Sequence, residues 1–227
     1  TRRMGDSIRF FKLKAKVLGL KKLTLAEVGT KMSKSSKKQS LEESIGMVSA
    51  AFGKVSPKFS DMFESFLKAG NFDIHPRKGK RGGAYCSGGY GVPTKILLNH
   101  ADDMQSASTM AHEMGHAIHF ELSKKQSVLY QDFTISIAEV ASTFFENVLF
   151  DYALEQASEK ERLSMLLEKV QDDMLVIYSQ IAYFNFETEL HGAVRAKGSL
   201  SNAEIAAMFL KCRKSYLGNA FEYAEGD

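Results

Sequence analysis

Residues 112–116 read HEMGH, a pattern with two histidines four positions apart and a glutamate directly after the first. The flanking segment 106–123 contains no proline and has apolar residues at helical spacing, which predicts a helix. On a helix, positions i and i+4 project from one face, one turn apart, so His112 and His116 can bind one zinc ion at about 2.0–2.1 Å each. Glu113 would then lie beside the metal and could accept a proton from water without being a ligand.

A third metal ligand is predicted in a second helix, expected over residues 134–154. Its segment IAEVAST, residues 137–143, places Glu139 among small and apolar side chains. A buried carboxylate without a partner is costly, so we expect Glu139 to lie against a cation. Two histidines and one glutamate leave a fourth position for water, as a hydrolytic zinc site requires. For HEMGH taken alone, the alternative is a helix whose histidines only pack against the core or face water.

Three further residues carry weaker signals. Glu146 lies seven residues after Glu139 on the same helical face and could orient a ligand imidazole, although a surface ion pair explains it nearly as well. His119 lies one turn beyond His116 and is either a support of the metal site or a packed histidine. Cys86 lacks the histidine and asparagine pattern of a cysteine nucleophile, so we do not assign it that role.

Most of the remaining chain is predicted to be helical. Ser56 and Pro57 form a typical helix start, and the apolar stripe that follows ends at Gly70. Two further helices begin with capping boxes, formed by Ser158 with Glu161 and by Ser201 with Glu204. The first of these helices is expected to reach about residue 198, a length typical of a molecule larger than 227 residues.

The glycine-rich segment 79–99 is the exception, because glycine at this density disfavours a helix. We predict two short strands, 84–86 and 95–98, joined as a β-hairpin. A phosphate-binding loop is the weaker alternative, because the order G-x-x-x-x-G-K-[ST] is missing and no helix follows directly. An edge strand with small side chains lets another backbone approach closely, so we favour that interpretation.

Composition and charge describe an ordinary globular protein of 227 residues, 44% apolar and 25% charged. No stretch reaches the ~18 apolar residues of a membrane span, and two cysteines are too few for a disulfide framework. We therefore expect a cytoplasmic protein without a membrane partner.

The N-terminal segment 1–40 is basic, with twelve lysines and arginines against two acidic residues. Apolar residues recur in it at helical spacing, so its lysines, Lys14 among them, are predicted to form the solvated face of a helix. Residues 31–39, KMSKSSKKQ, are predicted to form a surface loop. Nucleic-acid binding is the alternative, and we expect none, because no aromatic and basic platform accompanies the charge.

Three separated motifs together resemble the oligoendopeptidase F branch of the M3 zinc oligopeptidases. They are HEMGHAIH, the later segment IAEVASTFFE, and GKRGGAYCSGGYG with PTKILLN upstream. The resemblance runs from about Leu18 to the C-terminus. It implies a mainly α, zincin-like catalytic domain with a small β-hairpin, one Zn²⁺ per chain, and hydrolysis of internal bonds in short peptides.

The resemblance also assigns roles to individual positions. His112, His116 and Glu139 match the zinc ligands of the family, and Glu113 matches its general base. The strand along which a peptide substrate is laid out matches Gly83, Ala84, Tyr85 and Cys86.

The sequence departs from the family in length. Members usually have more than twice as many residues, with a helical N-terminal half over the substrate channel and a C-terminal histidine and tyrosines that stabilise the oxyanion. We therefore expect a fragment of a longer enzyme, whose partners include the missing N- and C-terminal portions. Within it we predict a single catalytic domain over 1–227, with a basic helix and loop (1–40), the hairpin (79–99), a metal-binding helix pair (104–155) and a helical C-terminal part (158–217).

Two other functions stay open. One is a metal-stabilised domain without catalytic competence that binds peptides or assembles with another chain. The other is a zinc carboxypeptidase, although such enzymes usually lack both the hairpin and the third histidine matched by His119.

Overall fold

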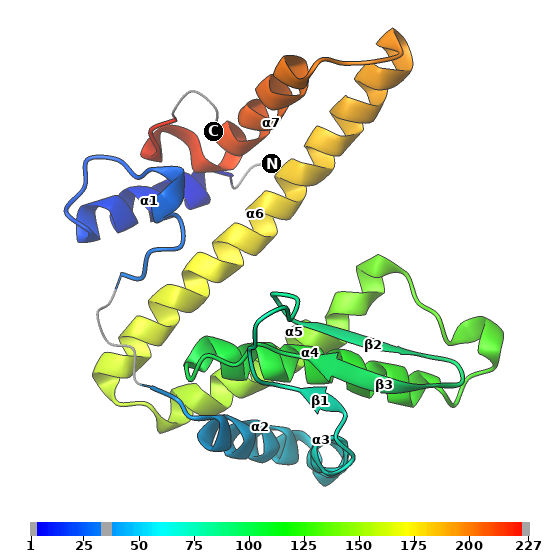
Figure 1. The fold of residues 1–227 in the computed structure, drawn as a ribbon. Helices are drawn as coiled ribbons and strands as arrows, with labels where there is room; N and C mark the ends of the chain where they lie inside the picture. Colours follow the sequence, from blue (N-terminus) through cyan, green and yellow to red (C-terminus); the bar gives the residue numbers. More distant parts are fainter. Residues whose placement is uncertain (1–3, 33–37, 224–227) are drawn as a thin grey trace. The chain divides into compact units, whose positions relative to one another are not determined.

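The structure, a computed structural model, describes residues 4–32 and 38–223. Seven helices and one small sheet make up most of this part of the chain (Figure 1). The helices are α1 (Met4–Val17), α2 (Leu41–Val55), α3 (Pro57–Lys68), α4 (Met104–Ser123), α5 (Ile135–Gln156), α6 (Glu159–Lys197) and α7 (Asn202–Leu217). The strands are β1 (Phe72–Asp73), β2 (Tyr85–Gly89) and β3 (Val92–Leu97). The predicted fold class, mainly α with a small β-hairpin, is confirmed.

The chain divides into two compact units, each with its own hydrophobic core. The first, residues 36–158, contains α2 to α5 and the sheet, and we call it the site unit because it holds every candidate site residue. The second, which we call the helical unit, contains α1, α6 and α7. The single catalytic domain over 1–227 stays a prediction, and residues 33–37 of the predicted loop 31–39 lie outside the described residues.

Local sequence signals set several helix ends. Pro57 occupies the first turn of α3, as predicted, and Gly70 follows its end with φ +63°, a conformation that glycine adopts without strain. Ser201 and Glu204 form the predicted capping box of α7. Helix α6 has 39 residues and ends just before residue 198, so its predicted extent is confirmed.

The sheet has the strand order β1-β3-β2. Strands β2 and β3 form the predicted antiparallel hairpin, with Cys86 opposite Ile96, and β1 pairs with β3 in parallel. The two-residue strand β1 was not predicted, because so short a segment carries no alternating pattern. In the described residues no strand pairs with the outer edge of β2, so this edge is free.

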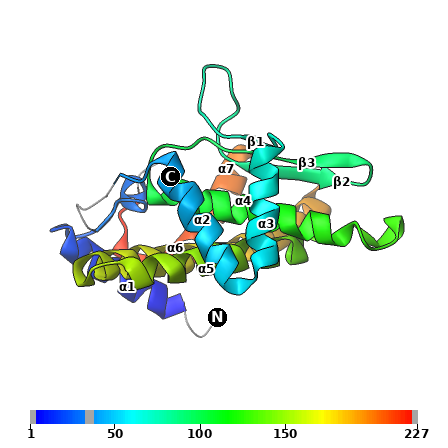
Figure 2. The same cartoon turned by 90° about the horizontal axis from the view of Figure 1, so that it is seen from below.

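The loop between β1 and β2 extends beyond the sheet (Figure 2), and Lys80 connects it to the strands. Its side chain is 2% exposed, and its ammonium group donates to the Asp73 carboxylate and to three backbone carbonyls. Those carbonyls belong to Asp73, His75 and Leu98. Since Leu98 follows β3, one ammonium group joins the ends of β1 and β3 just before β2 begins.

The core of the site unit lies between α2, α3, α4, α5 and the inner face of the sheet. Aromatic rings join its layers: the Phe52 ring of α2 lies 4.5 Å from that of Phe145 in α5, and 6.0 Å from that of Phe63 in α3. Met110 and Met114 bring α4 into the same core and have no exposed surface. Helix α4 is therefore packed on several sides, which suits it to hold side chains in fixed positions.

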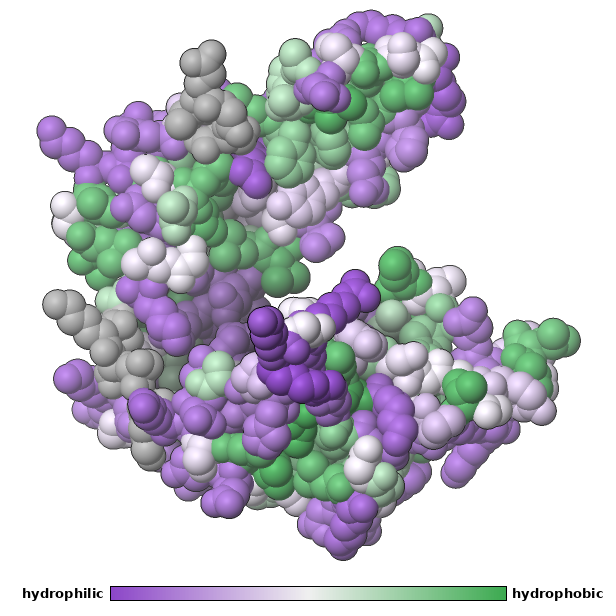
Figure 3. All heavy atoms as spheres, in the orientation of Figure 1, coloured by the Kyte–Doolittle hydropathy of each residue, from purple (hydrophilic) through white to green (hydrophobic). Residues whose placement is uncertain are grey.

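The surface of the helical unit is not uniformly polar, and hydrophobic atoms are also exposed in the space-filling view (Figure 3). An apolar stripe follows α6 at spacings of three, four and seven residues, formed by Leu163, Leu166, Val170, Ile177 and Phe184, each at least 41% exposed. No helix of the described residues is long and apolar enough to cross a membrane.

The prediction that all lysines of α1 face solvent is wrong for Lys14. Its side chain is fully buried, and its ammonium group donates to the backbone carbonyl of Val28 and to Gln171 Oε1, both at 2.5 Å. These acceptors come from distant positions in the chain, so the periodicity of α1 could not reveal them. Burial lowers the pKa of Lys14 to about 8, with Asp172 and Glu27 acting in the opposite direction.

We expect Lys14 to make the stability of the protein rise with pH. Unfolded chains keep the Lys14 proton up to about pH 10.5, whereas the folded chain releases it near pH 8, so the unfolded state binds more protons between these values. The free energy of unfolding of the wild type, measured by urea titration relative to Lys14→Met, should therefore increase by about 1 kcal/mol between pH 7.5 and 9. A difference that is constant over this range would contradict the assignment.

Candidate metal centre

Helix α4 carries both histidines of the HEMGH motif. Asp103 directly precedes the helix and caps it, its side chain accepting from the backbone N–H of Ser106 at 2.8 Å. Its apolar face is buried in the core, so His112 and His116 lie on the opposite side, partly exposed and one turn apart. Their rings lie 5.0 Å apart at an interplanar angle of 84°. Both Nε2 atoms thus point into one space beside the helix.

Helix α5 approaches α4 at Gly115, the glycine between the two histidines. A Cβ atom at this position would lie 2.7 Å from the backbone oxygen of Ala141 and 2.7 Å from the Cα of Ser142. Only a residue without a side chain permits this contact. Because Ala141 and Ser142 follow Glu139 by two and three residues, the contact also fixes where the Glu139 side chain begins.

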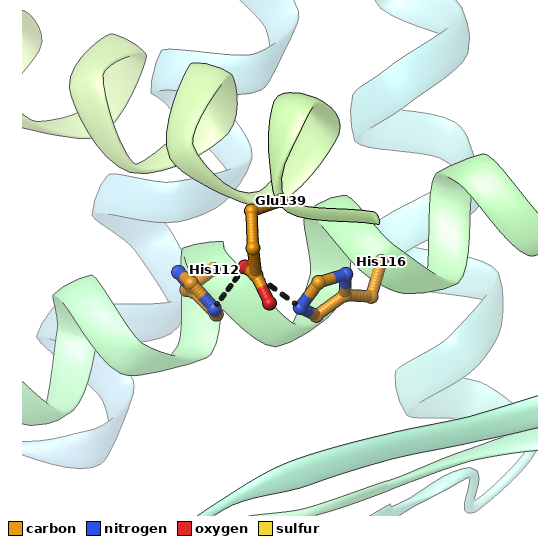
Figure 4. A group of neighbouring side chains, drawn as sticks. All are labelled: His112, His116 and Glu139. Atoms are coloured by element: carbon orange, nitrogen blue, oxygen red, sulfur yellow. Dashed lines mark ion pairs between the residues drawn. The ribbon is translucent and has the colours of Figure 1, made fainter. Parts of the chain in front are cut away.

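Glu139 places its carboxylate between the two imidazoles (Figure 4). Its Oε2 lies 3.2 Å from His112 Nε2 and 3.4 Å from His116 Nε2. Atoms that bind zinc tetrahedrally at about 2.1 Å are about 3.4 Å apart, so these separations fit a single ion. Imidazole lone pairs also repel a carboxylate oxygen at such distances unless a proton or a cation lies between them. The three residues could therefore hold a divalent metal ion.

Glu139 lies beside the two histidines, as predicted, but the prediction that its side chain is buried is wrong. Its side chain is 57% exposed rather than buried. The N-terminal part of α5 carries exposed apolar residues around it, such as Ile135 and Val140, which no described element covers. Small and apolar neighbours in the sequence were therefore not evidence of burial.

Each of the three potential ligands makes a further hydrogen bond. His112 Nδ1 lies 3.2 Å from Glu146 Oε2, a bond that raises the pKa of His112 despite its partial burial. Ser108 donates to the other oxygen of Glu146 at 3.1 Å. If Nδ1 carries the proton that Glu146 accepts, the lone pair of His112 Nε2 faces Glu139. This is the arrangement that metal-binding histidines usually have.

His116 and Glu139 are also held by neighbours on α5. The backbone carbonyl of Ala138 accepts from the His116 ring, whose pKa is nevertheless lowered, chiefly by burial. Ser142 donates its hydroxyl to Glu139 Oε2 at 2.6 Å. Ser142 was missed in the sequence, although a serine three residues after a helical glutamate is a signal that could have found it. The ligand atoms are thus positioned by α5 as well as by α4.

Glu113 lies on the buried side of the same turn and is 6% exposed. Its Oε2 has no hydrogen-bond partner among the described residues, while the backbone N–H of Cys86 donates to its carboxylate. Burial raises the pKa of Glu113, and the nearby His112 acts in the opposite direction. A half-satisfied carboxylate of raised pKa can accept and return a proton.

The hydrogen bond to Cys86 places Glu113 at the free edge of β2. Tyr85 and Ser87 lie opposite Leu97 and Lys95 of β3, and main-chain groups of alternate residues point to opposite edges of a strand. The Cys86 N–H, which points to Glu113, therefore faces away from β3. The predicted substrate segment, Gly83 to Cys86, includes the start of this edge, and its role stays a prediction. Burial raises the pKa of Cys86 to about 12, which keeps its thiol protonated at neutral pH.

His119 packs against the loop that precedes α5. Its ring stacks on Phe133 at 4.0 Å and 13°, and its Nδ1 is buried without a hydrogen-bond partner among the described residues. The structure therefore shows a packed ring, one of the two alternatives open from the sequence. A supporting role at the metal site stays a prediction for His119.

We expect Gly115→Ala to weaken zinc binding at least tenfold, because the added methyl group would push α5 and Glu139 away from the histidines. Gly46→Ala is the control, since this glycine lies in α2 with nothing within 4 Å of an added Cβ. Zinc affinity is measured by competition with a chromogenic chelator. Equal affinity in the two variants would contradict the packing argument.

We expect Glu146→Gln to lower zinc affinity by about 10–100-fold, because the neutral amide holds the His112 imidazole less firmly. Glu155→Gln, which removes a carboxylate of the same helix paired with Lys54 at the surface, is the control and should bind zinc normally. The same chelator competition compares both. A Glu146→Gln affinity within a factor of two of the wild type would show that this contact is a surface ion pair only.

Known proteins match this chain over nearly all of its length. The model of peptidase family M3 matches residues 9–226. The group B oligopeptidase PepB of Streptococcus agalactiae is 30% identical over 92% of this chain and 35% of its own length, and oligopeptidase PepF of Bacillus subtilis is 28% identical over 93% and 32%. The chain thus spans about a third of the length of the curated relatives that it matches.

Solved structures agree on the fold. A candidate oligoendopeptidase F from Bacillus anthracis strain Ames superposes with a TM-score of 0.80 at 17% identity, covering 96% of this chain and 40% of that one. PZ peptidase A with an inhibitor also gives 0.80 at 17% identity, covering 99% and 40%. With a family model that spans nearly all its residues, and with the HEMGH and Glu139 cluster inside the matched region, this chain belongs to peptidase family M3.

Proposed function

We propose that this chain provides the catalytic centre of a zinc-dependent endopeptidase that hydrolyses internal bonds of short peptides. The observation that carries the proposal is the meeting of His112, His116 and Glu139 beside a buried glutamate at a free strand edge. Peptidases of family M3 are zinc enzymes, and the relatives PepB and PepF are named oligopeptidases. One zinc ion per chain, held by these three residues, is part of the proposal.

In this mechanism each side chain at the candidate site has a separate role. A zinc ion held by His112, His116 and Glu139 would supply polarisation of the scissile carbonyl and would lower the pKa of a water molecule. Glu113 accepts the proton of the attacking water at Oε2, the oxygen without a partner, and then returns it to the leaving nitrogen. The Cys86 N–H holds the carboxylate in place meanwhile. Glu146 keeps the proton of His112 on Nδ1.

The substrate would lie along the free edge of β2. An extended peptide added to a strand edge is bound chiefly through its main chain, which gives broad tolerance of sequence. Gly83, Ala84, Tyr85 and Cys86 form the start of this edge, where the backbone can be approached closely. This placement brings a peptide bond next to Glu113.

The proposal also includes residues outside this chain that complete the active site, and a location in the cytoplasm. Residues that stabilise the oxyanion would come from outside this chain, and the lack of one such donor typically costs ~10²–10³ in kcat. The enzyme would act in the cytoplasm, which its two free cysteines suit.

The decisive variant is Glu113→Gln. It should bind one zinc ion per chain but lose at least 100-fold in the hydrolysis of a quenched fluorescent peptide, because the amide cannot accept the proton. Glu121→Gln alters a carboxylate of the same helix that bonds to Thr94 and Lys124, and should retain activity. Bacillus subtilis PepF serves as the positive control for the assay.

The outcome separates the alternatives. Zinc binding without hydrolysis by the wild-type chain, under conditions where PepF is active, would favour a peptide-binding or assembly domain. Release of only C-terminal residues would favour a carboxypeptidase. Unchanged turnover in Glu113→Gln would remove this residue from the mechanism.

A further inference from the structure

The loop between β1 and β2 carries four cationic side chains and no acidic one. The cations are Arg77, Lys78, Lys80 and Arg81. Two of them are engaged within the fold, because Arg77 and Lys80 both pair with the carboxylate of Asp73. Arg81 is held in a different way and has no part in the mechanism above. Of the four, it lies closest in sequence to Tyr85, where β2 begins.

Arg81 is stacked on a side chain of β2. Its guanidinium carbon lies 5.7 Å from the centre of the Tyr85 ring. One amide fixes the backbone at this point, since Asn99 donates to the carbonyl of Arg81 at 2.9 Å and to that of Gly83 at 2.8 Å. Stacking uses the plane of a guanidinium and leaves N–H groups at its edge available. Arg81 is exposed, and it forms no ion pair in the part of the chain that the structure describes.

The stacked pair lies on the outer face of the hairpin, which is turned away from the core. Cys86 packs against that core, and successive side chains of a strand point to opposite faces, so Tyr85 and Ser87 point outward. Residues directly opposite each other share a face, which adds Lys95, the partner of Ser87. Neither β2 nor β3 contains an acidic residue. The outer face at the start of β2 is therefore cationic.

A peptide on the free edge of β2 would bring one side chain next to this pair. The Cys86 N–H contacts Glu113, and the main-chain groups of Ala84 face the same edge, because alternate residues of a strand do so. A peptide paired antiparallel to β2, the more stable arrangement, extends its C-terminal side from Glu113 toward Ala84. Its residue opposite Tyr85 shares the outer face, with the two Cβ atoms about 4.5–5.5 Å apart.

The register sets which substrate residue meets Arg81. Tyr85 precedes Cys86 by one residue, which is about 3.3 Å along the strand. One residue earlier on β2 corresponds to one residue later on an antiparallel peptide. With the scissile bond beside Glu113, the residue opposite Tyr85 is therefore one of the first two after that bond.

We propose that Arg81, stacked on Tyr85, binds a carboxylate of the substrate at one of the first two positions after the scissile bond. Stacking presents the edge of the guanidinium, which matches the two oxygens of a carboxylate. The carboxylate comes either from an Asp or Glu side chain or from the C-terminus of the peptide. This inference rests on the peptidase function proposed above and adds a substrate preference to it.

The first test uses quenched fluorescent peptides that end in an amide and differ only at these two positions. At one of them Glu should raise kcat/KM by about fivefold over Gln, and Lys should lower it, because Arg81 attracts a carboxylate and repels an ammonium group. In Arg81→Met, which lacks the guanidinium, the Glu-to-Gln ratio should fall below about twofold. Lys58→Met removes an exposed cation of α3 and is the control, which should keep the wild-type ratio.

The second test distinguishes the two sources of the carboxylate. Peptides with Gln at both positions end two residues after the scissile bond, in either a carboxylate or an amide, and their cleavage is followed by chromatography. A preference for the carboxylate that Arg81→Met removes would identify the C-terminus as the ligand, and would also favour the carboxypeptidase alternative. A Glu preference that Arg81→Met removes, with equal cleavage of the two ends, would identify the side chain.

Binding separates this proposal from the proposed function. Fluorescence anisotropy compares the same peptides on zinc-loaded Glu113→Gln, with and without Arg81→Met. If the wild type hydrolyses no peptide, but Glu113→Gln binds carboxylate peptides more tightly and Arg81→Met abolishes the difference, the function fails and the Arg81 site stands. Hydrolysis that treats carboxylates and amides equally at both sources, or a preference that Arg81→Met leaves unchanged, would overturn the Arg81 site alone.

Discussion

The contact between α4 and α5 at Gly115 is the constraint on which the site depends. Two helices meet so closely there that the backbone of Ala141 and Ser142 occupies the space of a side chain. Because Glu139 lies within one helical turn of this contact, the contact sets where its side chain begins, and its carboxylate lies between the two imidazoles. A glycine with no catalytic chemistry of its own thereby determines whether three ligands converge.

Each potential ligand is also held by a hydrogen bond from a neighbour on α5. Glu146 bonds to His112, the carbonyl of Ala138 to His116, and Ser142 to Glu139. All three supports come from α5, so the same packing that delivers Glu139 also orients the histidines. Such supports usually strengthen metal affinity, because the ligands need no rearrangement on binding. The arrangement nevertheless brings lone pairs and a carboxylate together, which a cation would relieve.

The sequence predicts the features of the fold and the site that depend on neighbouring residues, but not those that depend on contacts between distant elements. The helical spacing of His112 and His116, the start of α3 at Pro57 and the hairpin around the glycines follow from neighbouring residues, and all were predictable. The roles of Gly115, Ser142 and the Cys86 N–H depend on which elements pack together, and periodicity does not encode that. Lys14 shows the same limit, since its acceptors lie 14 and 157 residues away and the helical pattern of α1 placed it in solvent. Glu139 was predicted to lie at the metal site because it was expected to be buried. Its side chain is 57% exposed, so the position was right but the reason was wrong.

A crystal structure of the zinc-loaded chain, with anomalous diffraction recorded on both sides of the zinc absorption edge, tests most directly whether the three side chains hold one ion. We expect one strong zinc peak per chain, within about 2.0–2.2 Å of His112 Nε2, His116 Nε2 and a Glu139 oxygen. A zinc peak at other residues, or zinc bound to the histidines with Glu139 turned away, would contradict it.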